Sequence, residues 1–497
     1  MKALSAFVRT RSASVRRIRT AWHWHSKILV PIAIGLVAWP GHAKSQELTA
    51  DEVVSAAINA ANGAESVTTV LEGCRQLIQD FDAYNLAPEN KGLRRIDYGF
   101  TSVPKAHDGT PETLPVFWWK RIWTHAQYRG QVPLVFIHGG VGIDSWRGFR
   151  ELKRVLQEYP GDYVAFDHRG EGCSKRMASN LAPSEYEHYR LRYVVKDMEY
   201  LRQNFLRYPR WRMLGQSRGA SILLHYLANY AGMNPGVVES AHVHGVVVKP
   251  DPTAPYLILQ RGFYRTGLRY LQEYPEDANR VLKIKSAIAD DDCWLGMDGV
   301  KVCGPSIIDL LSFHLTDKRR WPVLHGFIAA MLTHEEPDRA KIRSELQKHV
   351  KSGYYRFVPY LLGTNLVDTS SMPSADQNQN GELTTDTSYS ESFLCETRPL
   401  LEQIYPFFEA KGMEIPHSAV DPISYEKIIE GLRAGQTRLF FYHSVFDPIG
   451  NEVIAEANRE RLQELGELFS FVRLENSSHE GWFSEERVTE ELLRPSR

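Results

Sequence analysis

A serine lies between two glycines where a predicted strand meets a predicted helix. Residues 215–219 read GQSRG; the strand WRML precedes the serine, and the helical sequence RGASILLHYLANY follows it. A G-x-S-x-G sequence at such a junction forms a sharp turn that exposes the serine, with glycines where side chains would collide with nearby backbone. The start of the helix then favours negative charge that develops beside Ser217. We predict that Ser217 is a nucleophile; the alternative is a serine that caps the helix.

A second glycine-rich turn follows an earlier strand. Residues 138–142 read HGGVG, directly after the apolar run LVFI. Glycines at this point let backbone N–H groups turn toward a site, where they can stabilise an oxyanion. We expect the donors to be the N–H groups of Gly139 or Gly140 and of Arg218. The alternative is a plain turn between strand and helix. A nucleotide-binding loop is disfavoured, because no Lys-Ser/Thr pair follows and GGVG lacks the GxGxxG spacing.

Two later segments supply the base and the acid that a nucleophilic serine requires. Asp447, within HSVFDPIG, follows the penultimate predicted strand, and His479, within ENSSHEGW, follows the last one. The chain order Ser217, Asp447, His479 is the order of a hydrolase triad on a parallel sheet. The alternatives are a surface histidine and an aspartate that caps a helix, with Glu452 as the substitute acid.

The surrounding elements alternate between strands and helices. Apolar strands are predicted at 132–138, 162–167, 211–215, 242–248, 437–447 and 468–474, with helical patterns near 146–159, 189–207, 218–230, 452–465 and after 480. This alternation indicates an α/β fold with a mostly parallel sheet and helices on both faces. Two β-rich runs at 93–104 and 114–125 predict an antiparallel pair ahead of it.

The alternation stops at Lys249-Pro250. Residues 250–430 contain helical stretches and a polar run at 368–392, so we expect an inserted helical cap in which that run is a loop. The predicted organisation is a leader at 1–43, a helical extension at 44–92, the first part of the core at 93–249, the cap at 250–430 and the second part of the core at 431–497.

Residues 93–495 resemble the α/β-hydrolase superfamily, because four motifs occur in the expected order. The segments HGGVG, DHRGEGCS at 167–174 and GQSRG are most similar to proline iminopeptidases and related exported aminopeptidases, which typically carry HGGPG, DQRGxGxS and GGSWG. The chain departs from that pattern at Val141, His168 and Arg218. Asp167 and Arg169 are expected to brace the edge of the sheet rather than to take part in chemistry.

The resemblance implies an α/β-hydrolase fold with a large helical cap and acyl transfer to water without a cofactor. An aminopeptidase that releases N-terminal residues from small peptides is favoured, and a carboxylesterase acting on small esters is the alternative. A serine nucleophile disfavours dehalogenase and epoxide hydrolase chemistry, which need a carboxylate. The alternative outside the enzymes is a binding protein that has the same fold and no catalytic activity.

An aminopeptidase must bind a free α-ammonium group, and a partly desolvated cation requires a nearby carboxylate. In the family that the chain resembles, acidic cap residues do this. Glu396, in SFLCET at 392–397, is the candidate. The competing carboxylates are those of residues 290–292, and Glu396 could instead cap the helix that follows.

The first 43 residues have the composition of an export signal. They contain seven Lys and Arg and no Asp or Glu, and the apolar run at 28–39 ends shortly before Gly41-His42-Ala43. These features predict a secretory signal peptide cleaved after Ala43. An uncleaved anchor and an organelle transit peptide are the alternatives. We therefore expect a periplasmic or secreted protein without stable membrane insertion after cleavage.

The composition gives no indication of nucleic-acid binding or of a metal centre. The formal net charge is −1, from 59 basic and 60 acidic residues. Among the five cysteines no Cys/His spacing is typical of zinc, and His242 and His244 are expected to pack rather than to bind a metal. In an exported protein Cys293 and Cys303 could close a disulfide, or both could be free thiols.

Overall fold

The structure is a computed structural model of the 497-residue chain. It describes residues 67–124, 131–140, 145, 148, 151–174, 187–247, 255–288, 295–297, 300–302, 311, 314–332 and 423–494. The predicted leader, Glu396 and its competitors at 290–292, the polar run at 368–392 and the pair Cys293 and Cys303 lie outside the described residues.

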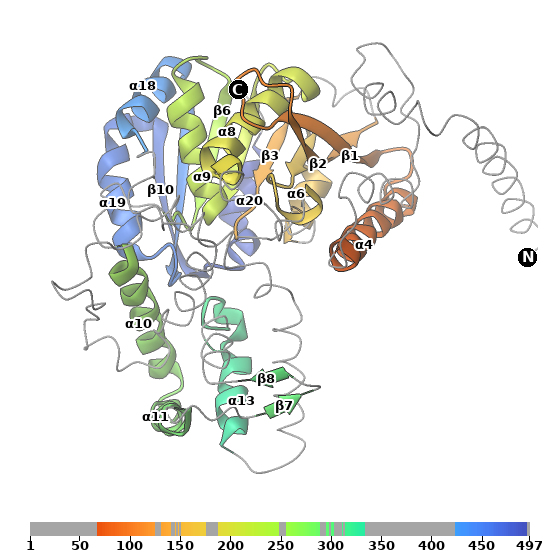
Figure 1. The fold of residues 1–497 in the computed structure, drawn as a ribbon. Helices are drawn as coiled ribbons and strands as arrows, with labels where there is room; N and C mark the ends of the chain where they lie inside the picture. The colour runs from red at the N-terminus through yellow and green to blue at the C-terminus, as the bar shows by residue number, and fades with distance from the viewer. Residues whose placement is uncertain are drawn as a thin grey trace, which may run out of the picture. The chain divides into compact units, whose positions relative to one another are not determined.

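An eight-stranded sheet forms the centre of the described chain (Figure 1), in the order β1-β2-β4-β3-β5-β6-β9-β10. The strands are β1 (Arg94–Pro104), β2 (Thr113–Trp123), β3 (Leu134–Ile137), β4 (Tyr163–Phe166), β5 (Trp211–Gln216), β6 (Val238–His244), β9 (Arg438–Phe446) and β10 (Phe469–Ser478). β1 and β2 pair antiparallel, as do β2 and β4, and every other neighbouring pair is parallel. The predicted antiparallel pair followed by a mostly parallel sheet is confirmed.

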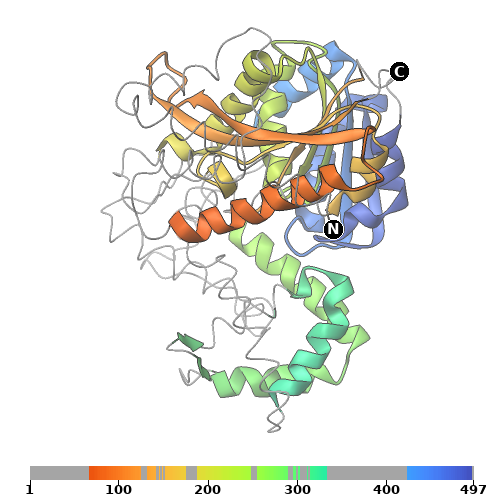
Figure 2. The ribbon, with the colours of Figure 1, turned by 90° about the vertical axis from the view of Figure 1, so that its right-hand side faces the viewer.

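Helices pack on both faces of this sheet (Figures 1 and 2). Along β3, Val135 and Ile137 belong to one buried cluster, and Leu134 and Phe136 belong to another, because successive side chains of a strand point to opposite faces. The first cluster is completed by α8 (Leu191–Tyr200), α9 (Arg218–Tyr226), α18 (Tyr425–Gly435) and α19 (Glu452–Leu462). The second is completed by α4 (Val67–Leu86), α6 (Lys153–Glu158) and α20 (Glu486–Leu493). Burial on both faces explains why β3 is apolar throughout.

The strand predicted at 242–248 instead spans Val238–His244. It ends at His244 because Gly245 has a φ of 61°, in the left-handed region that turns the chain out of the sheet. The apolar residues after this turn misled the prediction, since Val246 is also buried.

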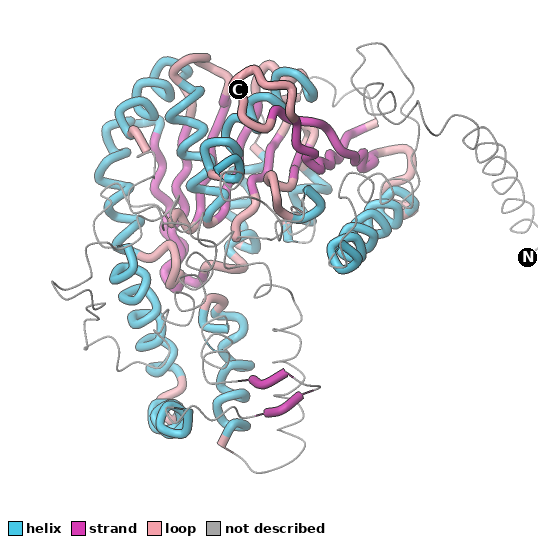
Figure 3. The backbone as a smooth tube through the Cα atoms, in the orientation of Figure 1, coloured by secondary structure: helices cyan, strands magenta, loops and turns pink. Residues whose placement is uncertain are grey.

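The described residues between β6 and α18 include α10 (Pro255–Glu273), α11 (Asp277–Ile288), the short antiparallel pair β7 (Leu295–Met297) and β8 (Val300–Val302), and α13 (Trp321–Met331). Figure 3 shows that helices dominate the described part of this region. It has its own buried cluster, which includes Tyr270, Trp321 and Ile328. The sequence analysis did not anticipate β7 and β8. Ile423 and α18 pack in the core of the main sheet, ahead of the expected boundary at residue 431.

None of the described helices is long and apolar enough to cross a membrane.

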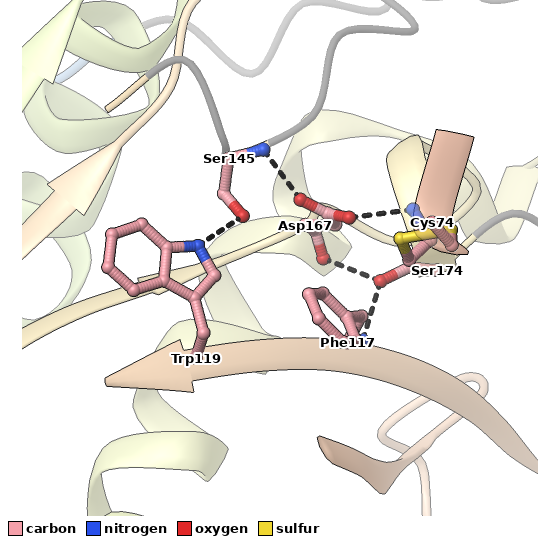
Figure 4. Close-up of a disulfide and its surroundings, with 7 residues drawn as sticks. Cys74, Phe117, Trp119, Ser145, Asp167 and Ser174 are labelled. Carbon is pink, nitrogen blue, oxygen red and sulfur yellow. Dashed lines mark hydrogen bonds between the residues drawn. A yellow bond between two sulfur atoms is a disulfide. The ribbon is translucent and has the colours of Figure 1, made fainter. Parts of the chain in front are cut away.

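A disulfide joins Cys74 in α4 to Cys173 in the turn after β4 (Figure 4), across 99 residues of sequence. The Cα atoms of the two cysteines are 5.6 Å apart. The sequence analysis missed this pairing, because connectivity between distant cysteines cannot be deduced from their spacing.

Candidate active site

Ser217 occupies a strained turn between β5 and α9. Its φ is 55° and its ψ is −126°, a conformation that non-glycine residues seldom adopt. A Cβ atom at Gly219 would lie 2.1 Å from the carbonyl oxygen of Ile137, and one at Gly215 would lie 2.6 Å from the carbonyl oxygen of Gly219. Both glycines of the motif are therefore required by close backbone packing, and the turn is the predicted strand-to-helix elbow.

Asp447 and His479 meet beyond the carboxyl ends of β9 and β10. Nδ1 of His479 lies 2.9 Å from each carboxylate oxygen of Asp447. The carboxylate also accepts hydrogen bonds from the backbone N–H groups of Ile449 at 2.8 Å and Gly450 at 2.9 Å. Because a carboxylate accepts, the proton of the neutral ring belongs on Nδ1, and this tautomer leaves the lone pair on Nε2. This arrangement can orient an imidazole as a base.

The electrostatics keep Asp447 ionised. Burial on its own would raise the pKa of Asp447, but attraction to His479 and the hydrogen bond with it outweigh burial. The nearby His244 and the N–H group of Ile449 act in the same direction, so the pKa of this carboxyl lies below its ordinary value. A carboxylate that stays charged can stabilise an imidazolium formed at His479.

Two glycines make room for this pair. A Cβ atom on Gly245 would lie 2.9 Å from Cε1 of His479 and 3.1 Å from Oδ2 of Asp447. A Cβ atom on Gly450 would lie 2.4 Å from the Cα atom of Gly245. A side chain on Gly245 would therefore collide with the carboxylate and the ring, and one on Gly450 would collide with the backbone of Gly245.

Gln216 links the elbow to the loop that follows β10 and contains His479, which we call the histidine loop. Its side-chain amide donates a hydrogen bond of 3.1 Å to the carbonyl oxygen of His479, and the N–H group of Ser217 donates to the carbonyl oxygen of His244 at 2.8 Å. Within the described residues, the recorded hydrogen bonds of the His479 ring go to Asp447 and not to the Ser217 hydroxyl. The proton transfer from Ser217 to His479 therefore stays a prediction.

The glycine turn after β3 presses against the elbow. A Cβ atom on Gly139 would lie 2.5 Å from the carbonyl oxygen of Gln216 and 2.7 Å from Cβ of Ser217. Gly140 has a φ of 74°, and Arg218 is the first residue of α9. Gly139 and Arg218, two of the residues predicted to supply oxyanion donors, thus lie next to Ser217.

Asp167 and Arg169 brace the turn after β4. The Asp167 carboxylate accepts from the N–H groups of Ser145 and Cys173, both at 2.6 Å (Figure 4). The Arg169 guanidinium donates to both oxygens of the buried Asp197. Both side chains are buried, and these contacts join neighbouring segments of the chain, as a bracing role requires.

A buried polar cluster that was not predicted from the sequence is formed by His138, His168, Glu171 and the side chain of Arg218. Nη1 of Arg218 lies 2.6 Å from Oε1 of Glu171, and the two imidazole rings stack with centroids 3.9 Å apart. Burial, followed by the neighbouring His168, lowers the pKa of His138. Burial, followed by Arg218, lowers the pKa of His168. A signal was present in the sequence, because opposite charges stand in two motifs that meet at the same edge of the sheet.

This cluster contains the residues best placed to hold a metal ion among those the structure describes. One ligand atom from each of His138, His168 and Glu171 lies within 4.8 Å of the others. The guanidinium of Arg218 already pairs with Glu171, however, and a second positive charge beside it in a buried place would be repelled. The donor set therefore fits an internal ion pair better than a metal centre.

His242 and His244 are buried and hydrogen-bonded within the sheet. His242 contacts Ser240 Oγ and the Tyr442 hydroxyl, each at 3.1 Å, and His244 Nε2 contacts Ser444 Oγ at 2.8 Å. Both rings thus serve packing, as expected.

Residues 132–283 match a family model described as the alpha/beta hydrolase fold. Together with the strand order and the elbow at Ser217, this match shows that the chain adopts the α/β-hydrolase fold, as predicted. A search of curated proteins gives no match. The resemblance to proline iminopeptidases is therefore not confirmed at the level of the subfamily.

Solved structures with a similar fold include three hydrolases. A carboxyl esterase from Bacillus coagulans is 11% identical with a TM-score of 0.35, covering 80% of this chain and 96% of that chain. An acetylester hydrolase from Corynebacterium glutamicum is 12% identical with a TM-score of 0.37, covering 80% and 95%. A serine hydrolase from Cycloclasticus zankles is 12% identical with a TM-score of 0.38, covering 80% and 96%. At these identities and TM-scores, the similarity to these structures gives no information about the substrate of this protein.

Proposed function

We propose that the protein is a serine hydrolase that transfers an acyl group to water. The observation that carries the proposal is the strained Ser217 elbow beside a hydrogen-bonded Asp447 and His479 at the carboxyl edge of a parallel sheet. A binding protein on the same fold would have no need for an oriented imidazole or for a serine held at a φ of 55°.

In the proposed reaction the hydroxyl of Ser217 attacks the substrate carbonyl and passes its proton to Nε2 of His479. The imidazolium then protonates the leaving group and becomes neutral again. In the second half of the reaction the neutral imidazole takes a proton from the water that attacks the acyl-enzyme, and it returns this proton to the oxygen of Ser217. Asp447 holds the Nδ1–H tautomer throughout. The backbone N–H groups of Arg218 and of Gly139 or Gly140 stabilise the oxyanion in each tetrahedral intermediate.

For the substrate we favour the N-terminal residue of a small peptide, on the strength of the HGGVG, DHRGEGCS and GQSRG motifs. Glu396 is the proposed anchor for the free ammonium group. A carboxylesterase fits the geometry around Ser217 equally well, because both reactions pass through the same kind of tetrahedral intermediate.

We also propose that the protein is exported. The basic and apolar leader at 1–43 supports this, and so does the Cys74–Cys173 disulfide, since disulfides form and persist chiefly in oxidising compartments.

A fluorophosphonate probe tests the proposed nucleophile. We expect the purified protein to be labelled and the variant Ser217→Ala to lose labelling completely. Ser221→Ala is a matched control, because Ser221 is a buried serine on the same helix, and it should label normally. Failure of the wild-type protein to label and to hydrolyse any substrate would refute the hydrolase proposal.

A substrate panel separates the two substrate classes. It compares aminoacyl amides with a free amino group, the same amides with a blocked amino group, and short p-nitrophenyl esters. Preference for the free-amine amides supports the aminopeptidase, whereas cleavage of esters alone would favour the carboxylesterase.

A further inference from the structure

Three loops at the carboxyl edge of the sheet meet at the carboxylate of Glu171. They are the turn after β3 with Gly140, the turn after β4 with His168, and the start of α9 with Arg218. The side chains of Arg218 and Glu171 are 5% and 1% exposed. None of these polar contacts belongs to the Ser217, His479 and Asp447 arrangement.

One route leads from Glu171 through Arg218. Nη1 of Arg218 donates to Oε1 of Glu171 at 2.6 Å and to the carbonyl oxygen of Gly140 at 3.4 Å. The backbone N–H of Arg218 is one proposed oxyanion donor, and the turn held by its side chain contains the other. A single residue therefore links both halves of the proposed oxyanion hole.

A second route leads from Glu171 through two imidazoles. Nδ1 of His168 lies 3.2 Å from Oε2 of Glu171 and 3.3 Å from Nη1 of Arg218, and the His168 ring stacks on that of His138. His138 directly precedes Gly139, and its Nδ1 donates to the Gly139 carbonyl oxygen at 3.2 Å. Each carboxylate oxygen of Glu171 is thus the start of a path to the same glycine turn.

We propose that Glu171 is a positioning residue that sets the geometry of the oxyanion hole through Arg218 and His168. This inference rests on the proposed serine hydrolase function. Oxyanion donors act only when they are fixed at the position that the developing charge will occupy. Loosening the glycine turn relative to α9 therefore weakens binding of the tetrahedral intermediate and leaves binding of the planar substrate largely unchanged.

The variant Glu171→Gln tests this role, because it keeps the size of the side chain and removes the charge that holds Arg218. Rates are measured per fluorophosphonate-reactive site, so that misfolded molecules do not count. We expect kcat to fall about tenfold, less than the loss of a complete oxyanion donor would cause, with KM changed less than twofold. The affinity for a boronic acid that forms a tetrahedral adduct with Ser217 should fall in parallel with kcat.

Glu199→Gln is the matched control. Glu199 forms a buried pair with Arg202 at 2.7 Å, with both side chains 8% exposed, and the recorded contacts of its carboxylate do not involve the glycine turn. This variant should lower thermal stability while kcat per reactive site stays within twofold of wild type.

A double variant covers the case in which Glu171→Gln does not fold. Glu171→Leu with Arg218→Met removes both charges together, which burial tolerates far better than the loss of one partner. We expect it to fold and to show the same loss of kcat and of boronate affinity. If either folded variant keeps kcat and boronate affinity within twofold of wild type, the positioning role is wrong. A wild-type protein that neither labels nor hydrolyses any substrate would instead refute the proposed function itself.

Discussion

Glycine residues set the space in which Asp447 and His479 meet. Gly245 combines a φ of 61° with a Cβ position 2.9 Å from the His479 ring. An alanine at this position would therefore incur two separate penalties, one in the backbone conformation and one in the placement of the ring.

The variant Gly245→Ala should lose at least tenfold in kcat, because the new methyl group displaces His479 from its bond with Asp447. The left-handed backbone adds a stability cost of about 1 kcal/mol. Gly466→Ala is the control: its φ is 59° and a Cβ atom there would meet nothing within 4 Å. Chemical denaturation should show the backbone cost in both variants and a further loss in Gly245→Ala, where the methyl group also meets the His479 ring. Normal activity of Gly245→Ala would contradict the proposed role of His479.

At the scale of elements, a segment ahead of α13 lies directly on the histidine loop. The N–H group of Lys318 donates to Ser478 Oγ at 2.9 Å, and the N–H group of Glu480 approaches the carbonyl oxygen of Thr316 at 3.4 Å. The Arg319 side chain lies over Gly481, where a Cβ atom would be 2.5 Å from its Cζ. The inserted region thus contacts the chain on both sides of His479.

We therefore expect Ser478→Ala to lower kcat several-fold, because it removes the hydroxyl that holds Lys318 to the loop. The hydroxyl also donates to the carbonyl oxygen of Glu480 at 3.1 Å, so the cost in stability should be about 2 kcal/mol, typical of two intramolecular hydrogen bonds. Ser484→Ala removes a hydroxyl that also bonds within this loop region, to the carbonyl oxygen of Gly481, but is exposed. Steady-state kinetics should show no change for that control. Equal rates in the two variants would mean that the inserted region does not position His479.

The elements that were predictable from the sequence are those specified by local patterns. The strands with continuous apolar runs, the elbow at Ser217 and the positions of Asp447 and His479 after the last two strands all follow from residues close together in the chain. Contacts between distant segments were not predictable. The Cys74–Cys173 disulfide joins residues whose spacing contains no periodic signal. For the bond between Glu171 and Arg218 the sequence offered opposite charges in two motifs at one edge of the sheet, but nothing that paired these two side chains.

At the scale of the whole molecule, several buried histidines make stability depend on pH. Burial is the main cause that lowers the pKa of His138, His168 and His443, and it lowers that of His242 to about 3. In the unfolded chain a histidine titrates near 6.5. Below that pH the unfolded state binds more protons than the folded state, so stability falls as the pH decreases. The lowered pKa of Asp447 acts in the same direction, but only at pH values below about 4.

His242 allows this effect to be measured separately, because its hydrogen bonds go to Ser240 and Tyr442 rather than to Asp447 or His479. Its ring stacks on those of Phe440 and Tyr442. Between pH 7 and pH 5 a group with a folded pKa of about 3 costs about 2 kcal/mol of stability, at about 1.4 kcal/mol for each pH unit below 6.5. His242→Gln should therefore reduce the difference between urea unfolding free energies at the two pH values by about that amount. Tyr442→Phe removes the hydroxyl bonded to His242 but keeps the titrating ring, so it should lower stability at both pH values and preserve the difference. An unchanged difference in His242→Gln would show that this ring is protonated in the folded state.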